Sequence, residues 1–179
     1  GTSKVCVLIA DMVDDTHYEV LGVGTAPARG MSKGVVVNVE DAKATIREAV
    51  VAAERSAGYE IGTAFVSMAG AHVSSVNSHG VVGVSGNRAI AQDDIDRALD
   101  AARAIAIPHN REVLHIIPRN FVVDGQEGIR MPLGMHGFRL EVEAHLITAA
   151  TMTVKNLTQC IEAAGVMVEQ FVLNPLAAS

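Results

Sequence analysis

The chain has 179 residues, of which 49% are hydrophobic and 19% are charged, so it can bury a core and is not of the disordered class. Its 14 Lys and Arg stand against 20 Asp and Glu, a formal net charge of -6. That balance argues against a nucleic-acid binder, because neutralising phosphates needs a clustered cationic face. Aromatic residues are only 3%, so the core must be aliphatic, as is typical of helices packed on sheets.

The beginning of the chain predicts an antiparallel hairpin followed by a short strand. Residues 4–10 form an almost continuous apolar run, and residues 18–24 alternate toward Val and Leu. Asp14-Asp15-Thr16 lies between the two runs and has the chemistry of a turn. Residues 34–37 form the third strand.

An amphipathic helix and a strand come next. Apolar residues recur at three- and four-residue spacing over residues 42–57, which predicts a helix. Asn38 is placed to cap its beginning, and Gly58 is placed to end it. Residues 61–68 predict a buried strand.

Residues 61–87 contain no Asp, Glu, Lys or Arg, which raises the question of a membrane span. The segment also contains His72, Asn77, His79 and several Ser and Gly residues. Such a segment cannot satisfy its polar groups in lipid, so we do not expect it to cross a membrane.

A second unit begins near residue 70. Residues 73–84 read as a Ser- and Gly-rich strand. A helix follows that begins at Gln92-Asp93-Asp94, where acidic groups suit the positive end of the helix dipole, and that ends before Pro108.

The second unit continues with two strands. Residues 113–117 and 121–123 are strand-like but are broken by Pro118, which predicts an edge or bulged strand. Residues 138–147 alternate apolar and polar side chains and predict a half-exposed antiparallel strand. The order within this unit is therefore strand, helix, strand, strand.

The end of the chain predicts a helix over residues 152–164 and a strand over residues 168–173. The beginning and end of the chain look like parts of one sheet-and-helix layer. We therefore expect an inserted middle unit, with domain ranges 1–69, 70–147 and 148–179.

Few side chains suggest chemistry on their own. Gly1-Thr2-Ser3-Lys4 could offer backbone N–H groups, hydroxyls and a cation to a phosphate, although four residues at a terminus are more often simply a frayed end. Cys6 and Cys160 are far apart in aliphatic segments, which indicates two reduced, buried thiols in a cytosolic protein. Residues 124–128 read as a glycine-rich turn and lack the ligand spacing of a calcium loop.

No complete active site can be assembled from the residues alone. The seven His residues are scattered singly, without the helical spacing of a zinc site. The chain contains no GxxxxGK[ST] and no GxGxxG motif.

An ordered set of motifs carries a resemblance to a known family. They are Gly1-Thr2-Ser3-Lys4, Gly22-Val23-Gly24, Asn77-Ser78-His79-Gly80, Leu114-His115-Ile116-Ile117-Pro118, Asp124-Gly125-Gln126-Glu127-Gly128-Ile129, Pro132-Leu133-Gly134-Met135 and Asn174-Pro175-Leu176-Ala177. Together they cover essentially the whole chain in order. In this respect the chain resembles the bacterial cell-division protein family FtsA.

The resemblance implies a fold and a cellular role. The fold would be α/β with an α+β insert: a partial actin-like, ribonuclease H-like subdomain interrupted by a strand-helix-strand-strand module called SHS2. The family belongs to the divisome and tethers the FtsZ ring (Z ring) to the cytoplasmic face of the cell membrane at the division site. It polymerises with itself and recruits later division proteins.

The resemblance also implies that this chain is a fragment that is not an enzyme by itself. In the family, ATP with Mg lies between two halves of the protein, and only the first phosphate segment is present here. By resemblance we assign phosphate contact in the intact parent to Gly1, Thr2, Ser3 and Lys4, and we expect no cofactor on the fragment. FtsZ binding and the membrane-binding C-terminal helix would lie in parts of the parent outside this chain.

For partner binding we expect the polar side of the helix in the second unit to contribute. Its candidate residues are Asp93, Asp96, Arg97, Asp100 and Arg103. A merely solvated helix face is the plainer explanation of any one of these charges. Two other functions stay open: a PilM-like pilus-assembly protein, and a fragment of another actin- or Hsp70-like ATPase.

Overall fold

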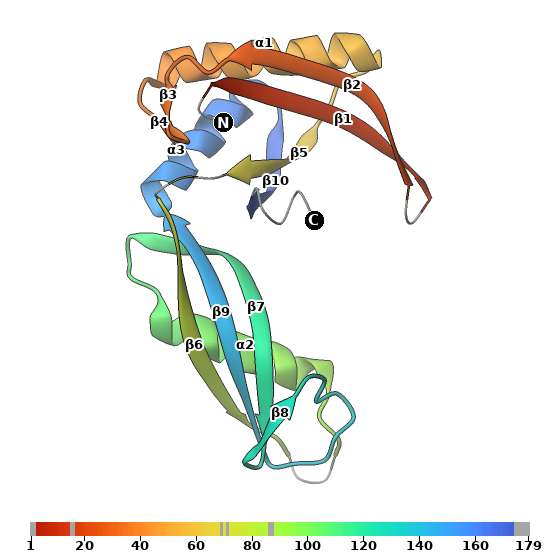
Figure 1. Ribbon diagram of the computed structural model, residues 1–179, viewed down its shortest axis with the longest axis vertical. Helices are drawn as coiled ribbons and strands as arrows, with labels where there is room; N and C mark the ends of the chain where they lie inside the picture. The colour runs from red at the N-terminus through yellow and green to blue at the C-terminus, as the bar shows by residue number, and fades with distance from the viewer. Residues whose placement is uncertain (1–2, 15–16, 69, 71, 86–87, 174–179) are drawn as a thin grey trace. The chain divides into compact units, whose positions relative to one another are not determined.

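The computed structural model describes residues 3–14, 17–68, 70, 72–85 and 88–173. Gly1, Thr2 and the turns expected at 15–16, 86–87 and 174–175 lie outside this described part. The chain forms two compact units, one comprising Gly1–His72 with Met152–Ser179 and the other comprising Val73–Thr151. The fold is α/β, and each unit packs helix against sheet (Figure 1).

The first unit contains the predicted hairpin, with β1 (Lys4–Asp14) antiparallel to β2 (His17–Pro27). Helix α1 (Val39–Ala57) covers one face of this hairpin (Figure 1). Glycines on β2 allow the close approach: a Cβ added at Gly24 would lie 2.0 Å from the carbonyl oxygen of Ala49. The hairpin prediction is confirmed, and both strands are longer than the sequence pattern suggested.

Both ends of α1 are capped as the sequence predicts. The Asn38 side chain accepts hydrogen bonds from the backbone N–H groups of Glu40 and Asp41, at 3.1 and 3.3 Å. Gly58 has a left-handed φ of 85°, and its N–H donates to the Glu54 carbonyl at 2.8 Å.

The remaining strands of the first unit are short. The strand expected at 34–37 is instead a two-residue ladder between β3 (Met31–Ser32) and β4 (Val35–Val36). Strand β5 (Thr63–Met68) pairs in parallel with β10 (Met167–Leu173), and α3 (Thr151–Glu162) precedes β10 in the chain.

The expectation that β5 is buried was wrong. Of its residues only Met68 is buried, and Phe65 is 64% exposed. The physical reason is that β5 belongs to a two-stranded sheet, so alternate side chains face solvent. An apolar run is compatible with burial on both faces but does not guarantee it.

The second unit is a four-stranded antiparallel sheet with one helix on one face (Figure 1). The strand order is β6-β9-β7-β8. The elements are β6 (Val73–Gly83), α2 (Gln92–Ala106), β7 (Arg111–Val123), β8 (Gln126–Ile129) and β9 (Arg139–Ala150).

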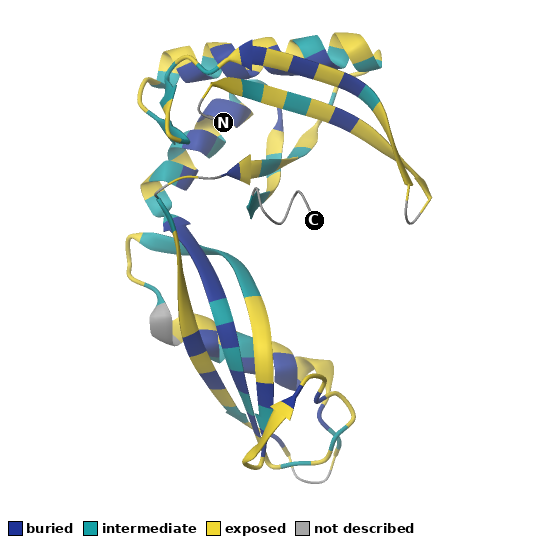
Figure 2. Ribbon diagram, viewed as in Figure 1, coloured by how far each residue is buried: buried dark blue, intermediate teal, exposed yellow. Residues whose placement is uncertain are grey.

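The core of the second unit lies between α2 and the central strand β9. Four residues that alternate along β9 are 0% exposed: Leu140, Val142, Ala144 and Leu146. Figure 2 shows this alternation as bands of buried and less buried residues along the strand. The prediction of a half-exposed antiparallel strand is confirmed.

Strand β7 continues through Pro118 instead of breaking there. Its pairing with β9 is irregular at Val113/His115 and at Pro118/Asn120, so the predicted bulging is confirmed and the predicted break is wrong. Pro118 is tolerated because β8 pairs with β7 only at Phe121 and Val123, away from the proline.

The glycine-rich segment after β7 is only partly a turn. Asp124 and Gly125 have φ angles of 49° and 86° and form the turn itself. Residues 126–128, which the sequence assigned to the same turn, belong to β8. The Asp124 carboxylate accepts hydrogen bonds from the backbone N–H groups of Phe138 and Arg139, at 3.0 and 2.9 Å, which fixes the turn to β9.

Candidate phosphate-binding and partner-binding sites

The described part of the phosphate segment lies at the open end of the β1–β2 hairpin. Ser3 and Lys4 are both exposed, and Lys4 lies opposite Pro27. The Ser3 carbonyl accepts a hydrogen bond from Ala28 at 3.1 Å, which ties this end of the hairpin together. Gly1 and Thr2, the other two candidates, lie outside the described residues.

The described residues of this segment, Ser3 and Lys4, offer an anion one hydroxyl and one ammonium group. Within the described residues, no carboxylate pairs with the Lys4 ammonium, so its charge is available. The same part of the chain contains no group of three or more His, Cys, Asp and Glu side chains placed to hold a metal ion. A triphosphate clamp needs more donors than Ser3 and Lys4 supply.

The five candidate partner-binding residues lie on the solvent side of α2. All are exposed: Asp93, Asp96, Arg97, Asp100 and Arg103. Their partners are mostly one helical turn away, with Arg97 3.5 Å from Asp93 and Arg103 3.9 Å from Asp100. The helix therefore presents a continuous polar face, as predicted.

Arg97 also makes hydrogen bonds within the second unit itself. Its guanidinium donates to the Gly83 carbonyl at 3.3 Å and to the carboxylate of Asp94. Because this side chain holds the helix to the end of β6, a mutation of Arg97 would disturb both the fold and any partner contact. Asp96 and Asp100 are better probes of the surface.

Asp94 is the residue whose importance the sequence did not reveal. It is 0% exposed, and Arg88 donates to its two carboxylate oxygens at 2.5 and 2.9 Å. It also accepts from the backbone N–H of Ala91 at 3.0 Å, the position of the acid in a capping box. Hydrogen bonding from Arg88 and Ala91 lowers the pKa of Asp94 well below its ordinary range.

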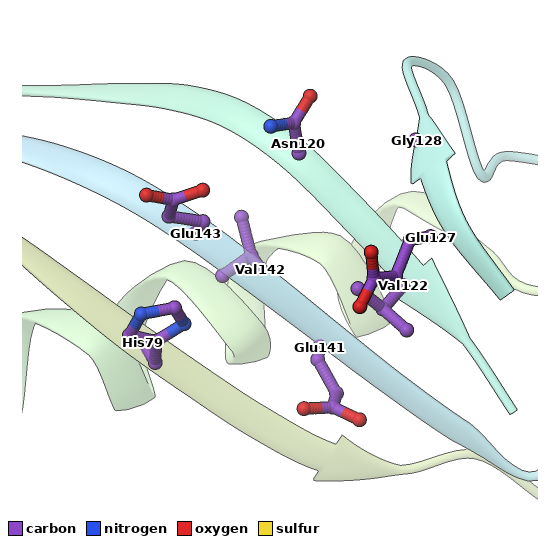
Figure 3. A pocket seen from close by; sticks show the side chains of 8 residues that line it. All are labelled: His79, Asn120, Val122, Glu127, Gly128, Glu141, Val142 and Glu143. Carbon is purple, nitrogen blue, oxygen red and sulfur yellow. The ribbon is translucent and has the colours of Figure 1, made fainter. Parts of the chain in front are cut away.

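The sheet face opposite α2 contains an open hollow of about 450 Å³ (Figure 3). Its lining comes from all four strands: His79, Asn120, Val122, Glu127, Gly128, Glu141, Val142 and Glu143. Three of these are carboxylates, and none is Lys or Arg. The sequence pattern did not predict this hollow, although the alternation along β9 places Glu141 and Glu143 on one face.

Two of these carboxylates lack a cationic partner. Glu141 lies 3.3 Å from the Arg139 guanidinium. Glu127 and Glu143 pair with no Lys or Arg of the described chain. Beside the hollow, Nδ1 of His145 lies 2.7 Å from the Asn77 side-chain oxygen and links β9 to β6. The lining of the hollow is therefore negatively charged.

The two cysteines have different environments. Cys160 is buried, which raises the pKa of its thiol, and its Sγ lies 3.9 Å from the Val39 carbonyl oxygen. Cys6 is exposed, so the prediction of two buried thiols was wrong for this residue. The physical reason is that Cys6 lies on β1 between Val5 and Val7, which take the other, more buried face of the hairpin.

In the described residues, no helix is both long enough and apolar enough to cross a membrane.

Comparison with known proteins gives a consistent result along the chain. Residues 70–148 match the family model "SHS2 domain inserted in FTSA". The chain is 44% identical to the cell division protein FtsA of Pseudomonas aeruginosa over 179 residues, which is 100% of this chain and 43% of that protein. It is 43% identical to FtsA of Borreliella burgdorferi and 37% identical to FtsA of Bacillus subtilis, covering 100% and 99% of this chain and 44% and 40% of those proteins.

Among solved structures, the chain resembles one from the PilM-PilN type IV pilus biogenesis complex. The TM-score is 0.64 at 14% identity, over 99% of this chain and 46% of that chain. At this identity the likeness concerns the fold, which is that of part of an actin-like subdomain with the SHS2 module inserted. The chain spans less than half the length of the relatives that it matches, and along its whole length it is similar to cell-division proteins of the FtsA family.

Proposed function

We propose that this chain is the part of a bacterial cell-division protein that associates with itself and recruits other division proteins. The observation that carries the proposal is the similarity of the whole chain to proteins named cell division protein FtsA, at 33% to 44% identity. The intact protein would assemble and tether the FtsZ ring at the cytoplasmic face of the membrane. Contact with FtsZ and with the membrane would be made by other parts of that protein.

The nature of the second unit supports a role in protein contact. It offers an exposed polar helix face on α2 and an open, negative sheet face on the other side.

A bacterial two-hybrid assay would test this role. The chain would be paired with itself and with each division protein encoded in the same genome. We expect self-interaction and interaction with at least one later division protein. A chain that interacts with none of them while remaining folded would contradict the proposal.

We propose that ATP and Mg bind only to the intact protein, and that this chain is not an enzyme. Ser3 and Lys4 supply one cation and one hydroxyl, whereas phosphoryl transfer needs a metal ion and donors around the whole triphosphate. Titration of the chain with ATP and Mg in a calorimeter should show no saturable binding in the micromolar range. Micromolar affinity, or measurable release of phosphate, would contradict this assignment.

A role in pilus assembly is the second candidate, because the PilM-PilN structure shares the fold. The sequence identities separate the two candidates. The 14% identity to the PilM-PilN chain indicates only a shared architecture, whereas the 44% identity to FtsA of Pseudomonas aeruginosa over the whole chain favours a common family. We therefore place the chain in cell division.

A further inference from the structure

Strand β6 (Val73–Gly83) is an edge of the four-stranded sheet and has an unusually regular backbone. It pairs with β9 at all eleven positions without a bulge, whereas the pairing of β7 with β9 is interrupted twice. On the side away from β9, alternate N–H and C=O groups of a regular antiparallel edge point outward. In the described chain no other strand pairs with this side.

The sequence of β6 contains none of the usual features that protect such an edge. Natural edge strands are commonly interrupted by charged residues, Pro or bulges. Residues 73–83 contain no Asp, Glu, Lys, Arg or Pro. The opposite edge, β8, has only four residues and includes Glu127, so it is protected by its shortness and its charge. Of these two edge strands, β6 is therefore the one suited to accept an added strand.

Helix α2 restricts what can be added. The helix backbone lies directly against β6: the Ser78 hydroxyl donates to the Ala102 carbonyl at 2.8 Å, and a Cβ on Gly80 would lie 1.9 Å from the Ala98 carbonyl oxygen. Figure 1 shows α2 crossing behind β6. A second copy whose β6 paired antiparallel to this one would bring its own helix to the same side of the sheet and crowd α2. A single extended segment without a helix avoids this conflict.

The charge beside β6 defines the chemistry of that segment. On the open face, His79 and Val81 of β6 lie directly opposite Glu143 and Glu141 of β9. An added strand would lie two strand spacings from β9, roughly 10 Å. An extended Lys or Arg can reach a carboxylate across that distance, and Glu143 has no cationic partner in the described chain.

We propose that the β6 edge binds an extended, cationic segment of a partner protein as a fifth strand. Backbone hydrogen bonds to β6 supply the affinity, and alternate Lys or Arg side chains facing Glu141 and Glu143 supply the selectivity. The biological meaning of this site rests on the proposed recruiting function, but the site can be tested without it.

The test uses two synthetic peptides of the length of β6, one alternating Lys with Thr and Val, the other with Glu in place of each Lys. Hydrogen–deuterium exchange of the full 179-residue chain would be measured with each peptide. We expect the Lys peptide to slow hydrogen exchange in β6 and to bind at least tenfold more tightly than the Glu peptide. The affinity of the Lys peptide should fall as salt is added.

Two variants locate the site, and one serves as a matched control. Val81→Lys places a cation on the edge strand at a side chain that is 45% exposed. This variant should bind the Lys peptide at least tenfold more weakly than the parent chain does. Glu143→Gln should weaken that binding severalfold. Val23→Lys makes the same change on β2, at a side chain that is 47% exposed, and should leave binding unchanged.

Three outcomes would overturn the proposal. The first is slowed exchange at β8 or nowhere, and the second is equal binding of the Lys and Glu peptides. The third is protection of β6 that rises with protein concentration in the absence of peptide, together with sedimentation as a dimer, which would identify a second copy as the occupant. If the peptide binds β6 but the two-hybrid assay finds no division partner, the recruiting function fails and the edge site stands.

Discussion

At the scale of single residues, Asp94 determines the beginning of the second unit's helix. Its carboxylate joins Arg88, Arg97 and the backbone of Ala91, and so fixes the loop before α2 to the helix itself. The sequence shows three polar residues where α2 begins and correctly indicates an acidic helix start. The sequence does not show which of these three side chains turns inward, because that depends on the position of Arg88, six residues before Asp94.

Replacing Asp94 by Asn should destabilise the second unit strongly. The amide keeps the shape of the side chain but loses the charge, so the hydrogen bonds that two guanidinium groups donate to this buried side chain are weakened. We expect the melting temperature to fall by several degrees, measured by circular dichroism. Asp93→Asn, at an exposed neighbour on the same helix, should leave it nearly unchanged.

The Asp94 carboxylate also predicts how the difference in free energy of unfolding between the parent chain and Asp94→Asn depends on pH. Because the pKa of Asp94 is lowered on folding, its contribution is complete above the unfolded pKa of about 4 and is lost as the pH falls from there toward the folded pKa. Chemical denaturation should therefore show a constant stability gap between the parent and Asp94→Asn from pH 7 to 5. The gap should narrow below about pH 4, and a gap that widens there would contradict this assignment.

At the scale of elements, each unit packs a strand with glycine against a helix rich in alanine. Gly24 lies against Ala49 in the first unit, and Gly80 lies against Ala98 in the second. In both places the backbone of the helix touches the backbone of the strand, so even a methyl group has no room. The sequence predicted the helices and strands, but it could not predict these contacts because they join residues far apart in the chain.

Gly80→Ala should destabilise the second unit by about 3 kcal/mol, since the new Cβ would meet helix backbone that cannot move aside easily. Gly83→Ala is the matched control on the same strand, because a Cβ there meets nothing within 4 Å. Urea denaturation would measure both variants. Equal stability of the two would mean that α2 can shift without cost.

The polar face of α2 gives a prediction about binding. Reversing the charges of Asp96 and Asp100 together should weaken the interaction with a division partner severalfold and leave the fold intact, because both side chains are exposed. The control is Glu162→Lys with Glu169→Lys, the same charge change at exposed sites in the first unit. A pull-down in which both double variants bind like the parent would show that this face is only solvated.

At the scale of the whole molecule, the sequence indicated most elements and the resemblance indicated the family. Local patterns sufficed for the hairpin, the three helices and the capped ends of α1, since those depend on neighbouring residues. They failed where burial depends on sheet neighbours, as for Phe65 on β5 and Cys6 on β1. The hollow beneath Glu141 and Glu143 also escaped prediction, because it needs side chains from four strands.

The contrast between the two thiols makes the chain convenient for spectroscopy. A maleimide dye should react with native protein at Cys6 alone, giving one fluorophore per molecule without any mutation. Cys160 would react only after the first unit opens, so the rate of its modification would report how often that unit opens. The protein thus carries its own label site and its own unfolding probe.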